Sequence, residues 1–303
     1  TNFFNNLADN IDDIKTRHAN QHIPQIVGAV QEYLATGEEK YYNIAENFWN
    51  MVISRYAYSI GGVGQGENFR QPYQLAASID SDKNCETCAA YNMLKLTKEL
   101  NAFNPDDAKY MDYYERVLVN QIMGSQNPDV SDSMHNGVTY MYPIGPGAFK
   151  TYSDDYDSFT CCHGTGMENH VKYQESVYFK STKDDTLYVG LYIPSTVNWE
   201  EKGVRIQQEC EFPASSTKLT IQGNGDFDLK LRVPYWATTG FKVEVNGKVV
   251  VSDAEPSTYV SAGTEWNDGD IVTVSMPFTA HIDKTPDKLS GKTVASVMYG
   301  PLV

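Results

Sequence analysis

The spacing of apolar residues changes once along this chain, near residue 184, and the change sets the order of its structural parts. Before that point, apolar residues recur every three to four positions, as on one face of a helix. After it, segments alternate or carry β-branched runs, and Asn246-Gly247 between two such runs predicts a hairpin. Helices are predicted over five segments: 23–36, 40–59, 88–100, 106–123 and 165–179.

Two domains follow from this pattern. We expect a helical domain over residues 1–183 and an antiparallel β-sandwich over residues 184–303. At ~100–200 residues per domain, 303 residues are enough for both. Because the chain begins without Met and ends on an apolar run, we expect it to be part of a longer protein.

The charge of the chain limits its partners. Its net charge is −15, from 24 Lys and Arg against 39 Asp and Glu. An acidic surface repels phosphate backbones and anionic membranes, which argues against nucleic-acid binding. No apolar run approaches the ~20 residues needed to cross a bilayer, so no membrane partner is expected.

Four of the five cysteines form two close pairs, Cys85 with Cys88 and Cys161 with Cys162. Such a set does not read as a disulfide framework and indicates a metal or chemical site. Glu86 lies between the two cysteines of the first pair. Inside a helix, its side chain would point ~200° away from that of Cys88. The apolar stripe that begins just after Cys88 puts both at a helix entrance, where their side chains can converge.

The second pair precedes a predicted helix start. Thr165 and Glu168 match the capping box S/T-x-x-E, so Cys161 and Cys162 are expected in the loop before that helix. The partial positive charge at the N-terminal end of a helix favours thiolates. Three thiolates and one carboxylate would then form a site suited to Zn²⁺, with ligands Glu86, Cys88, Cys161 and Cys162.

Three alternatives stay open for the cysteines. The first is a structural zinc site of four cysteines that uses Cys85 in place of Glu86. The second is a redox pair of Cys85 and Cys88, although no βαβ pattern surrounds it. The third is that buried cysteines act only as small apolar residues, which is the default for Cys210 inside a predicted strand.

Other polar residues are weaker candidates. The glycine-rich stretch GGVGQGENF from Gly61 does not fit a phosphate loop, and we interpret it as a flexible loop that projects Glu67. The alternative for Glu67 is a solvated loop carboxylate. His18 and His22 are candidate substrate ligands or, equally, capping or core residues, and Tyr140 is a further polar candidate.

Five stretches together resemble the β-L-arabinofuranosidase glycoside hydrolases that use a zinc-bound cysteine as nucleophile. The stretches are RHANQHIPQIVG from Arg17, GENF from Gly66, CETCAAYNMLKLT from Cys85, TCCHGTGMENHVKYQESVYF from Thr160 and LYVGLYIPSTVNW from Leu187. Such proteins carry an (α/α)6 barrel followed by β-sandwich domains. The resemblance therefore implies the C-terminal part of that barrel and the first sandwich, with the N-terminal half of the barrel missing.

The resemblance also implies roles. It puts the nucleophile at Cys161, the acid/base at Glu67 and a substrate-contacting tyrosine at Tyr140. The zinc ligands that it implies are Glu86, Cys88, Cys161 and Cys162. Some members carry Pro after the cysteine pair, where this chain has His163.

The implied function is retaining, exo-acting hydrolysis of β-L-arabinofuranosides in plant glycans, with Zn²⁺ as cofactor and an oligosaccharide or glycan as partner. One alternative is a related glycosidase for another pentose or a branched acidic sugar. Another is a non-catalytic sugar-binding module with structural zinc. The resemblance further suggests a bacterial periplasmic or extracellular protein. Since half a barrel exposes its inner face, the chain alone is expected to be unstable or inactive.

Overall fold

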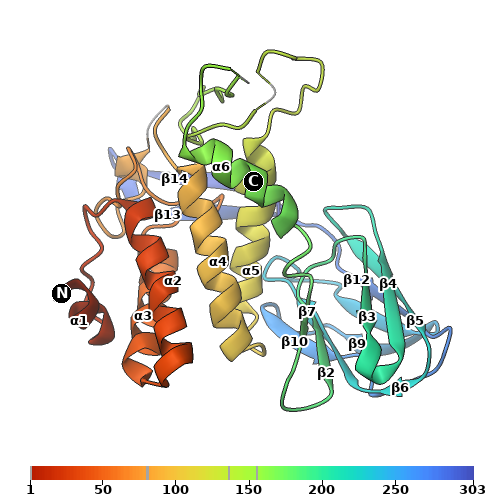
Figure 1. Ribbon diagram of the computed structural model, residues 1–303. Coiled ribbons are helices and arrows are strands. Elements are labelled where there is room, and N and C mark those ends of the chain that lie inside the picture. Colours follow the sequence, from red (N-terminus) through yellow and green to blue (C-terminus); the bar gives the residue numbers. More distant parts are fainter. Residues whose placement is uncertain (1, 80–81, 136, 155) are drawn as a thin grey trace.

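The computed structural model describes residues 2–79, 82–135, 137–154 and 156–303. Helices come first and strands follow, as predicted (Figure 1). None of the described helices is both long enough and apolar enough to cross a membrane. The helices are α1 (Asn2–Ala8), α2 (Ala19–Thr36), α3 (Glu39–Arg55), α4 (Thr87–Phe103), α5 (Lys109–Val117) and α6 (Cys161–Lys172), with short 3-10 or π segments η1 (Ala76–Ser78), η2 (Leu118–Ile122), η3 (Met123–Ser125) and η4 (Glu200–Lys202).

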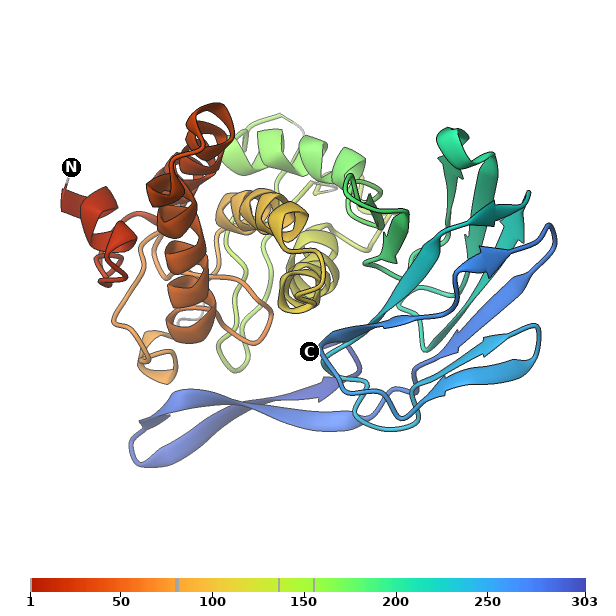
Figure 2. The same cartoon turned by 90° about the horizontal axis from the view of Figure 1, so that it is seen from below.

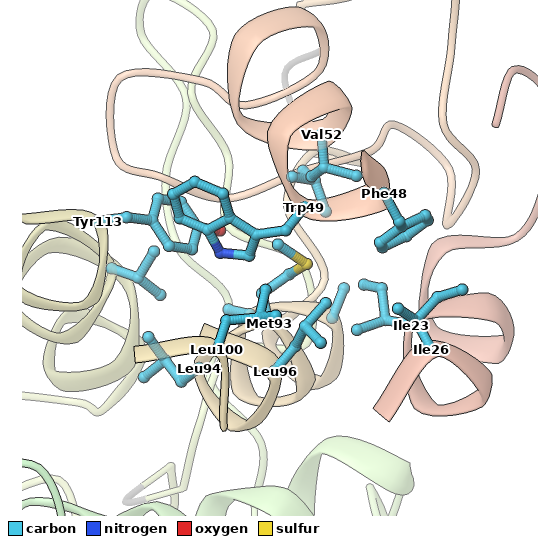
Figure 3. Close-up of a cluster of buried hydrophobic side chains, with 14 of the residues drawn as sticks. Ile23, Ile26, Phe48, Trp49, Val52, Met93, Leu94, Leu96, Leu100 and Tyr113 are labelled. Carbon is cyan, nitrogen blue, oxygen red and sulfur yellow. The ribbon is translucent and has the colours of Figure 1, made fainter. Parts of the chain in front are cut away.

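The helical part has its own apolar core. The buried faces of α2, α3 and α4 meet there, and Figure 3 shows Ile26, Phe48 and Met93 among the side chains that fill it. The one polar atom of Trp49 is satisfied, because its indole N–H donates to Thr97 Oγ1 at 2.9 Å. The helical period of the sequence therefore corresponds to real packing, and this core fixes the axis of α4, which carries part of the candidate site.

The bounds predicted for the last helix, 165–179, are wrong at both ends. α6 begins at Cys161, four residues before the predicted start at Thr165, because Thr160 and His163 form the capping box. The backbone N–H of Thr160 donates to His163 Nδ1 at 2.8 Å, so a histidine does what a Glu or Gln usually does at this position. At the other end, the aromatic stretch Tyr178–Lys180 is not helical but forms a strand paired with its neighbour.

Two sheets form the β-sandwich, and their facing side chains make a second core. One sheet has the strand order β1-β2-β7-β10 and the other β3-β4-β5-β12-β8-β9. The strands are β1 (Tyr178–Lys180), β2 (Thr186–Val189), β3 (Ser195–Trp199), β4 (Val204–Glu209), β5 (Ser216–Gln222), β6 (Gly225–Asp226), β7 (Asp228–Val233), β8 (Lys242–Val245), β9 (Lys248–Ser252), β10 (Thr258–Ser261), β11 (Glu265–Trp266), β12 (Ile271–Ser275), β13 (Ala280–Leu289) and β14 (Lys292–Tyr299).

The sandwich bears out one sequence prediction and corrects another. Asn246 and Gly247 form the predicted hairpin turn between β8 and β9, both with positive φ. The sheets are not wholly antiparallel, however, because β2 and β7 run parallel, with Leu187 opposite Leu229. The long excursion of the chain through the other sheet separates these two strands and allows them to run in the same direction.

A buried ionic group joins the sandwich to the helices. Arg232 of β7 is completely buried and contacts two carboxylates of α5, Asp112 at 2.5 Å and Glu115 at 2.8 Å. The indole N–H of Trp236 also donates to Glu115, and the Ser257 hydroxyl donates to Asp112. Charges buried this deeply require such partners.

A long hairpin, β13 with β14, leaves the sandwich and runs along the helical part (Figure 2). The carboxylate of Asp287 accepts the backbone N–H groups of Ala76 and Ala77 in η1, at 2.8 and 2.9 Å. The carbonyl of Ser78, at the end of η1, accepts the side-chain N–H of Asn84 at 2.9 Å. The hairpin thereby supports the segment that leads into α4.

The ionic group predicts a large effect of one substitution. Asp112→Ala leaves the Arg232 charge buried beside a single carboxylate, and we expect unfolding free energy to fall by about 3–5 kcal/mol. The matched control is Glu209→Ala, which removes an ion pair with Lys218 whose side chains are both about half exposed; its cost should stay below about 1 kcal/mol. Urea unfolding measures both. Equal, small losses would contradict the role given to Arg232.

Candidate active site

The entrance of α4 brings a carboxylate and a thiol together. Glu86 is the N-cap residue, with non-helical φ −54° and ψ 129°, and Cys88 stands inside the first turn. In a regular helix these two side chains would point apart; the non-helical backbone at Glu86 allows them to converge. The prediction that both residues lie at a helix entrance is confirmed.

The entrance of α6 supplies two more thiols. α6 lies across one end of α4 (Figure 1). Cys161 and Cys162 are its first two residues, not loop residues as predicted, so they lie within the first turn, where the helix dipole favours thiolate most. Cys162 is completely buried and Cys161 is exposed. The adjacent cysteines therefore have different access to solvent and to ligands.

These four side chains form one cluster. The ligand atoms of Glu86, Cys88, Cys161 and Cys162 all lie within 4.8 Å of one another. Cys88 Sγ is 3.2 Å from Cys162 Sγ, and Cys161 Sγ is 3.7 Å from Glu86 Oε1. Glu86 Oε2 is buried without a hydrogen-bond partner among the described protein atoms. This group can hold a metal ion, which would supply the partner that Glu86 Oε2 lacks.

The pKa shifts of these groups also favour a bound cation. Burial raises the pKa of the Glu86 carboxyl to about 8, and the charges of Cys88 and Glu67 add to the rise. The hydrogen bond between the thiols of Cys88 and Cys162 lowers the pKa of the Cys88 thiol to about 6 and raises that of Cys162. Although Cys161 is exposed at the surface, desolvation by its neighbours and its interaction with Cys88 raise the pKa of its thiol. Protein atoms alone thus keep most of the cluster protonated, and a bound cation would replace those protons.

Cys85 lies apart from this cluster. It is buried with Tyr58 and Ile60, and its sulfur packs against Gly62, where an added Cβ would lie 2.8 Å from it. It belongs to neither of the groups of potential metal ligands found among the described residues. The geometry therefore favours Glu86 over Cys85 as the fourth ligand. Cys210 lies in the sandwich, with its thiol 3.4 Å from the Tyr192 carbonyl.

The loop that carries Glu67 is hydrogen-bonded on two sides, so its interpretation as a flexible loop is wrong. Gly66 N–H donates to the Lys83 carbonyl at 2.6 Å, which ties the loop to the segment before Glu86. The Glu67 carbonyl accepts the N–H of Ala19, the first residue of α2, at 2.8 Å. Glu67 itself has φ 67°, a left-handed conformation that is uncommon outside glycine and marks a constrained backbone.

Tyr140 connects Glu67 to the cysteine cluster. Its hydroxyl donates to Glu67 Oε1 and lies 3.8 Å from Cys161 Sγ. His18 Nε2 lies 3.4 Å from the other carboxylate oxygen of Glu67. Burial raises the pKa of Tyr140, and its hydrogen bond to Glu67 raises it further, so Tyr140 remains a neutral donor. The predicted residues Glu67, Tyr140 and His18 therefore meet at the exposed side of Cys161.

His22 does not join this group in the described structure. Its ring lies edge-on to Phe3, with centroids 5.1 Å apart, and its Nδ1 is 2.9 Å from the His18 carbonyl. A substrate contact by His22 stays a prediction.

Two residues of the site were not recognised from the sequence. Thr165, interpreted as a helix cap, has its hydroxyl 3.2 Å from Cys88 Sγ. Gln121 is completely buried, and its side-chain N–H donates to the Cys85 carbonyl at 2.8 Å, which holds the segment before α4. The sequence did hold a signal for Gln121, because it and Asn120 are polar residues within the otherwise apolar stretch 117–122.

The comparisons with known proteins decide the family. The profile "Beta-L-arabinofuranosidase, GH127 catalytic domain" matches residues 1–175, and the profile of the GH127 middle domain matches residues 186–278. The chain belongs to this GH127 β-L-arabinofuranosidase family.

Relatives of known structure share the fold of this GH127 chain. It is 24% identical to a GH127 β-L-arabinofuranosidase from Geobacillus stearothermophilus T6, with a TM-score of 0.80 over 95% of this chain and 47% of that one. A GH127 β-arabinofuranosidase gives 26% identity and a TM-score of 0.80 over 97% and 48%. The predicted class, part of an (α/α)6 barrel followed by a β-sandwich, is confirmed.

A curated relative extends the comparison. The non-reducing end β-L-arabinofuranosidase of Bifidobacterium longum subsp. longum is 22% identical over 88% of this chain and 42% of its own length. The GH127 chain thus spans about half the length of the relatives that it matches.

The packing of the ligand segment predicts the effect of a single methyl group. A Cβ at Gly62 would lie 2.2 Å from Gln121 Oε1 and 2.7 Å from Cys85 Cβ, so Gly62→Ala must displace the segment before Glu86. We expect it to lower the free energy of unfolding by about 1–3 kcal/mol and to weaken metal binding. Gly28→Ala, in α2 with nothing within 4 Å of the new Cβ, is the control and should be neutral or stabilising. Equal stability of the two variants would contradict the close packing.

Proposed function

We propose that this chain carries the catalytic centre of a retaining, exo-acting β-L-arabinofuranosidase, with zinc held by Glu86, Cys88, Cys161 and Cys162. The observation that carries the proposal is the position of Cys161. It is the exposed member of a buried cysteine cluster, and one tyrosine hydroxyl contacts both its sulfur and the Glu67 carboxylate. A nucleophile and an acid/base group so arranged are the two groups that a retaining glycosidase needs.

The spacing of the cluster supports zinc as the metal. Tetrahedral Zn²⁺ with sulfur ligands at ~2.3 Å has sulfur–sulfur edges of about 3.8 Å and sulfur–oxygen edges of about 3.6 Å. The separation of 3.7 Å between Cys161 and Glu86 matches the sulfur–oxygen edge. Cys88 and Cys162 lie 3.2 Å apart, so their sulfurs would move apart by about 0.6 Å to bind one zinc ion. Three sulfurs and one oxygen are also the donor types that zinc accepts.

Zinc bound here would hold its three thiols as thiolates at neutral pH. With three thiolates and one carboxylate around a divalent ion, the cluster keeps an excess of negative charge, which leaves Cys161 nucleophilic. The N-terminal end of α6 also favours the thiolate form of this residue. Its exposed sulfur then attacks the anomeric carbon of the sugar.

Glu67 acts as the general acid in the first half of the reaction and as the general base in the second. In the first half, its carboxyl group gives a proton to the glycosidic oxygen while that bond breaks and the sulfur–carbon bond forms. In the second half, the Glu67 carboxylate removes a proton from water, whose oxygen attacks the anomeric carbon and displaces the Cys161 sulfur. Two inversions give net retention of configuration.

The neighbours of Glu67 support its role as acid and base. Tyr140 donates to one carboxylate oxygen and His18 lies at the other, so both oxygens have fixed surroundings. The hydrogen-bonded backbone of the loop holds the carboxylate toward the cluster. Catalytic groups need such fixed geometry more than they need flexibility.

The name of a relative supports the proposed substrate. A relative named a non-reducing end β-L-arabinofuranosidase supports removal of terminal β-L-arabinofuranosyl units from an oligosaccharide or glycan. That the glycan comes from plants is part of the same proposal. A related glycosidase for another pentose is distinguished by comparing pentofuranosides as substrates.

Substitutions of the two reacting groups test the proposal. Glu67→Gln should lower kcat/KM for an unactivated arabinofuranoside by about 10²–10⁴-fold, because no proton reaches the leaving oxygen. Cys161→Ser should lower it by at least about 10³-fold while metal stays bound by the other three ligands. Hydrolysis rates and metal content measure both effects.

The controls for these variants lie outside the site. Glu255→Gln changes an exposed carboxylate of the sandwich, and Cys210→Ser changes a thiol of the other domain; both should keep full activity. Full activity of either Glu67→Gln or Cys161→Ser would sink the assignment of that residue. Metal binding without any glycosidase activity, in an unsubstituted protein that includes the missing half of the barrel, would indicate a sugar-binding module with a structural metal.

A further inference from the structure

A cavity lies beside the candidate active site. Its volume is about 330 Å³, and Asp82, Tyr140, Phe149, Tyr152, Thr160 and His163 line it. This volume lies at the small end of ligand pockets, which measure ~300–1,000 Å³. Neither Glu67 nor Cys161 is among its lining residues, so the reaction described above does not use it.

Tyr140 connects the cavity to both reacting groups. Tyr140 lines it and contacts Glu67 and Cys161. Thr160 directly precedes Cys161 in the chain. On the Glu67 side, Asp82 precedes Lys83, whose carbonyl accepts the N–H of Gly66. A molecule in the cavity would therefore adjoin the proposed point of bond cleavage.

Exposed aromatic rings mark the rim of the cavity. Phe149 lines it although its side chain is 86% exposed. Phe159 is 79% exposed and lies nearly parallel to the His163 ring, with centroids 5.5 Å apart. Large apolar side chains so exposed beside a cavity indicate a binding surface. Flat aromatic rings flanked by hydroxyl groups suit the apolar face and the hydroxyl rim of a sugar.

The charge of the lining selects among sugars. The described residues around the cavity include the carboxylate of Asp82 but no lysine or arginine. Lys150, next to Phe149 in the chain, is turned away, since its ammonium group donates to the Gly124 carbonyl and lies over the Tyr142 ring. An acidic sugar would be repelled by the Asp82 carboxylate, and no lysine or arginine among the described lining residues would bind the acid group of that sugar. The lining therefore favours a neutral sugar.

We infer that this cavity binds the neutral sugar unit from which the arabinofuranosyl group is removed, with Phe149 as its stacking platform. The inference rests on the proposed function, since it assigns the leaving-group side of the same site. Specificity for the linkage and for the remaining glycan would then depend on the segment that follows Tyr140.

Phe149→Ala tests the inference, and Tyr156→Ala is its matched control. Tyr156 lies in the same loop and is 89% exposed, but it does not line the cavity. For a disaccharide of β-L-arabinofuranose and a neutral sugar, Phe149→Ala should lower kcat/KM about tenfold. For the methyl glycoside, whose leaving group is too small to reach the ring, it should stay within about twofold. Tyr156→Ala should leave both substrates within the same limit.

Other outcomes overturn the inference. Equal losses on both substrates, or no loss on either, would show that Phe149 does not contact the leaving sugar. A lowered unfolding free energy of Phe149→Ala would assign its ring to protein packing instead. Tighter binding of a disaccharide that carries a uronic acid would refute the preference for a neutral sugar.

If the unsubstituted protein, assayed together with the missing half of the barrel, hydrolyses neither glycoside, the proposed function fails, and binding alone decides the inference. Calorimetric titration with the neutral disaccharide should then show about tenfold weaker binding by Phe149→Ala and unchanged binding by Tyr156→Ala. Identical affinities of all three proteins, or no binding by any, would overturn it.

Discussion

The candidate site depends on the meeting of two helix N-termini. α4 and α6 bring one carboxylate and three thiols within 4.8 Å of one another, and three of these four residues are buried. Four groups that ionise to anions cannot all be charged in such a space without a counter-charge. The helix dipoles supply part of it, and protons supply the rest in the metal-free chain. A divalent cation would satisfy the cluster more completely, because it would also give Glu86 Oε2 a partner.

The remainder of the site is arranged around this cluster. Glu67 reaches it from a glycine-rich loop, and Tyr140 reaches it from the long segment between α5 and α6. That loop and the segment before α4 are joined by backbone hydrogen bonds. The β13–β14 hairpin supports them from outside through Asp287 and η1. Side chains far apart in the sequence thus share one framework, which is what a reaction between two fixed groups requires.

The sequence carried much of this information, but not all of it. The change of apolar period predicted the order of the domains, and the apolar stripe that begins after Cys88 predicted a helix entrance at Glu86 and Cys88. The start of α6 was missed because the capping box uses His163 rather than Glu or Gln, and Gly164 and Gly166 weaken the helical pattern there. The parallel pair of β2 and β7 could not be predicted, since partners across a long excursion of the chain leave no local signal. For the same reason, nothing local indicated that the last hairpin would pack on the helices.

X-ray absorption at the zinc edge can identify the ligands of the metal in the purified, zinc-loaded protein. We expect three sulfur ligands at ~2.3 Å and one oxygen ligand at ~2.0–2.2 Å. The same spectrum is expected for Cys85→Ser, since Cys85 lies outside the cluster. Four sulfur ligands that become three in Cys85→Ser, or a shell of oxygen and nitrogen alone, would show that Glu86, Cys88, Cys161 and Cys162 are not the zinc ligands.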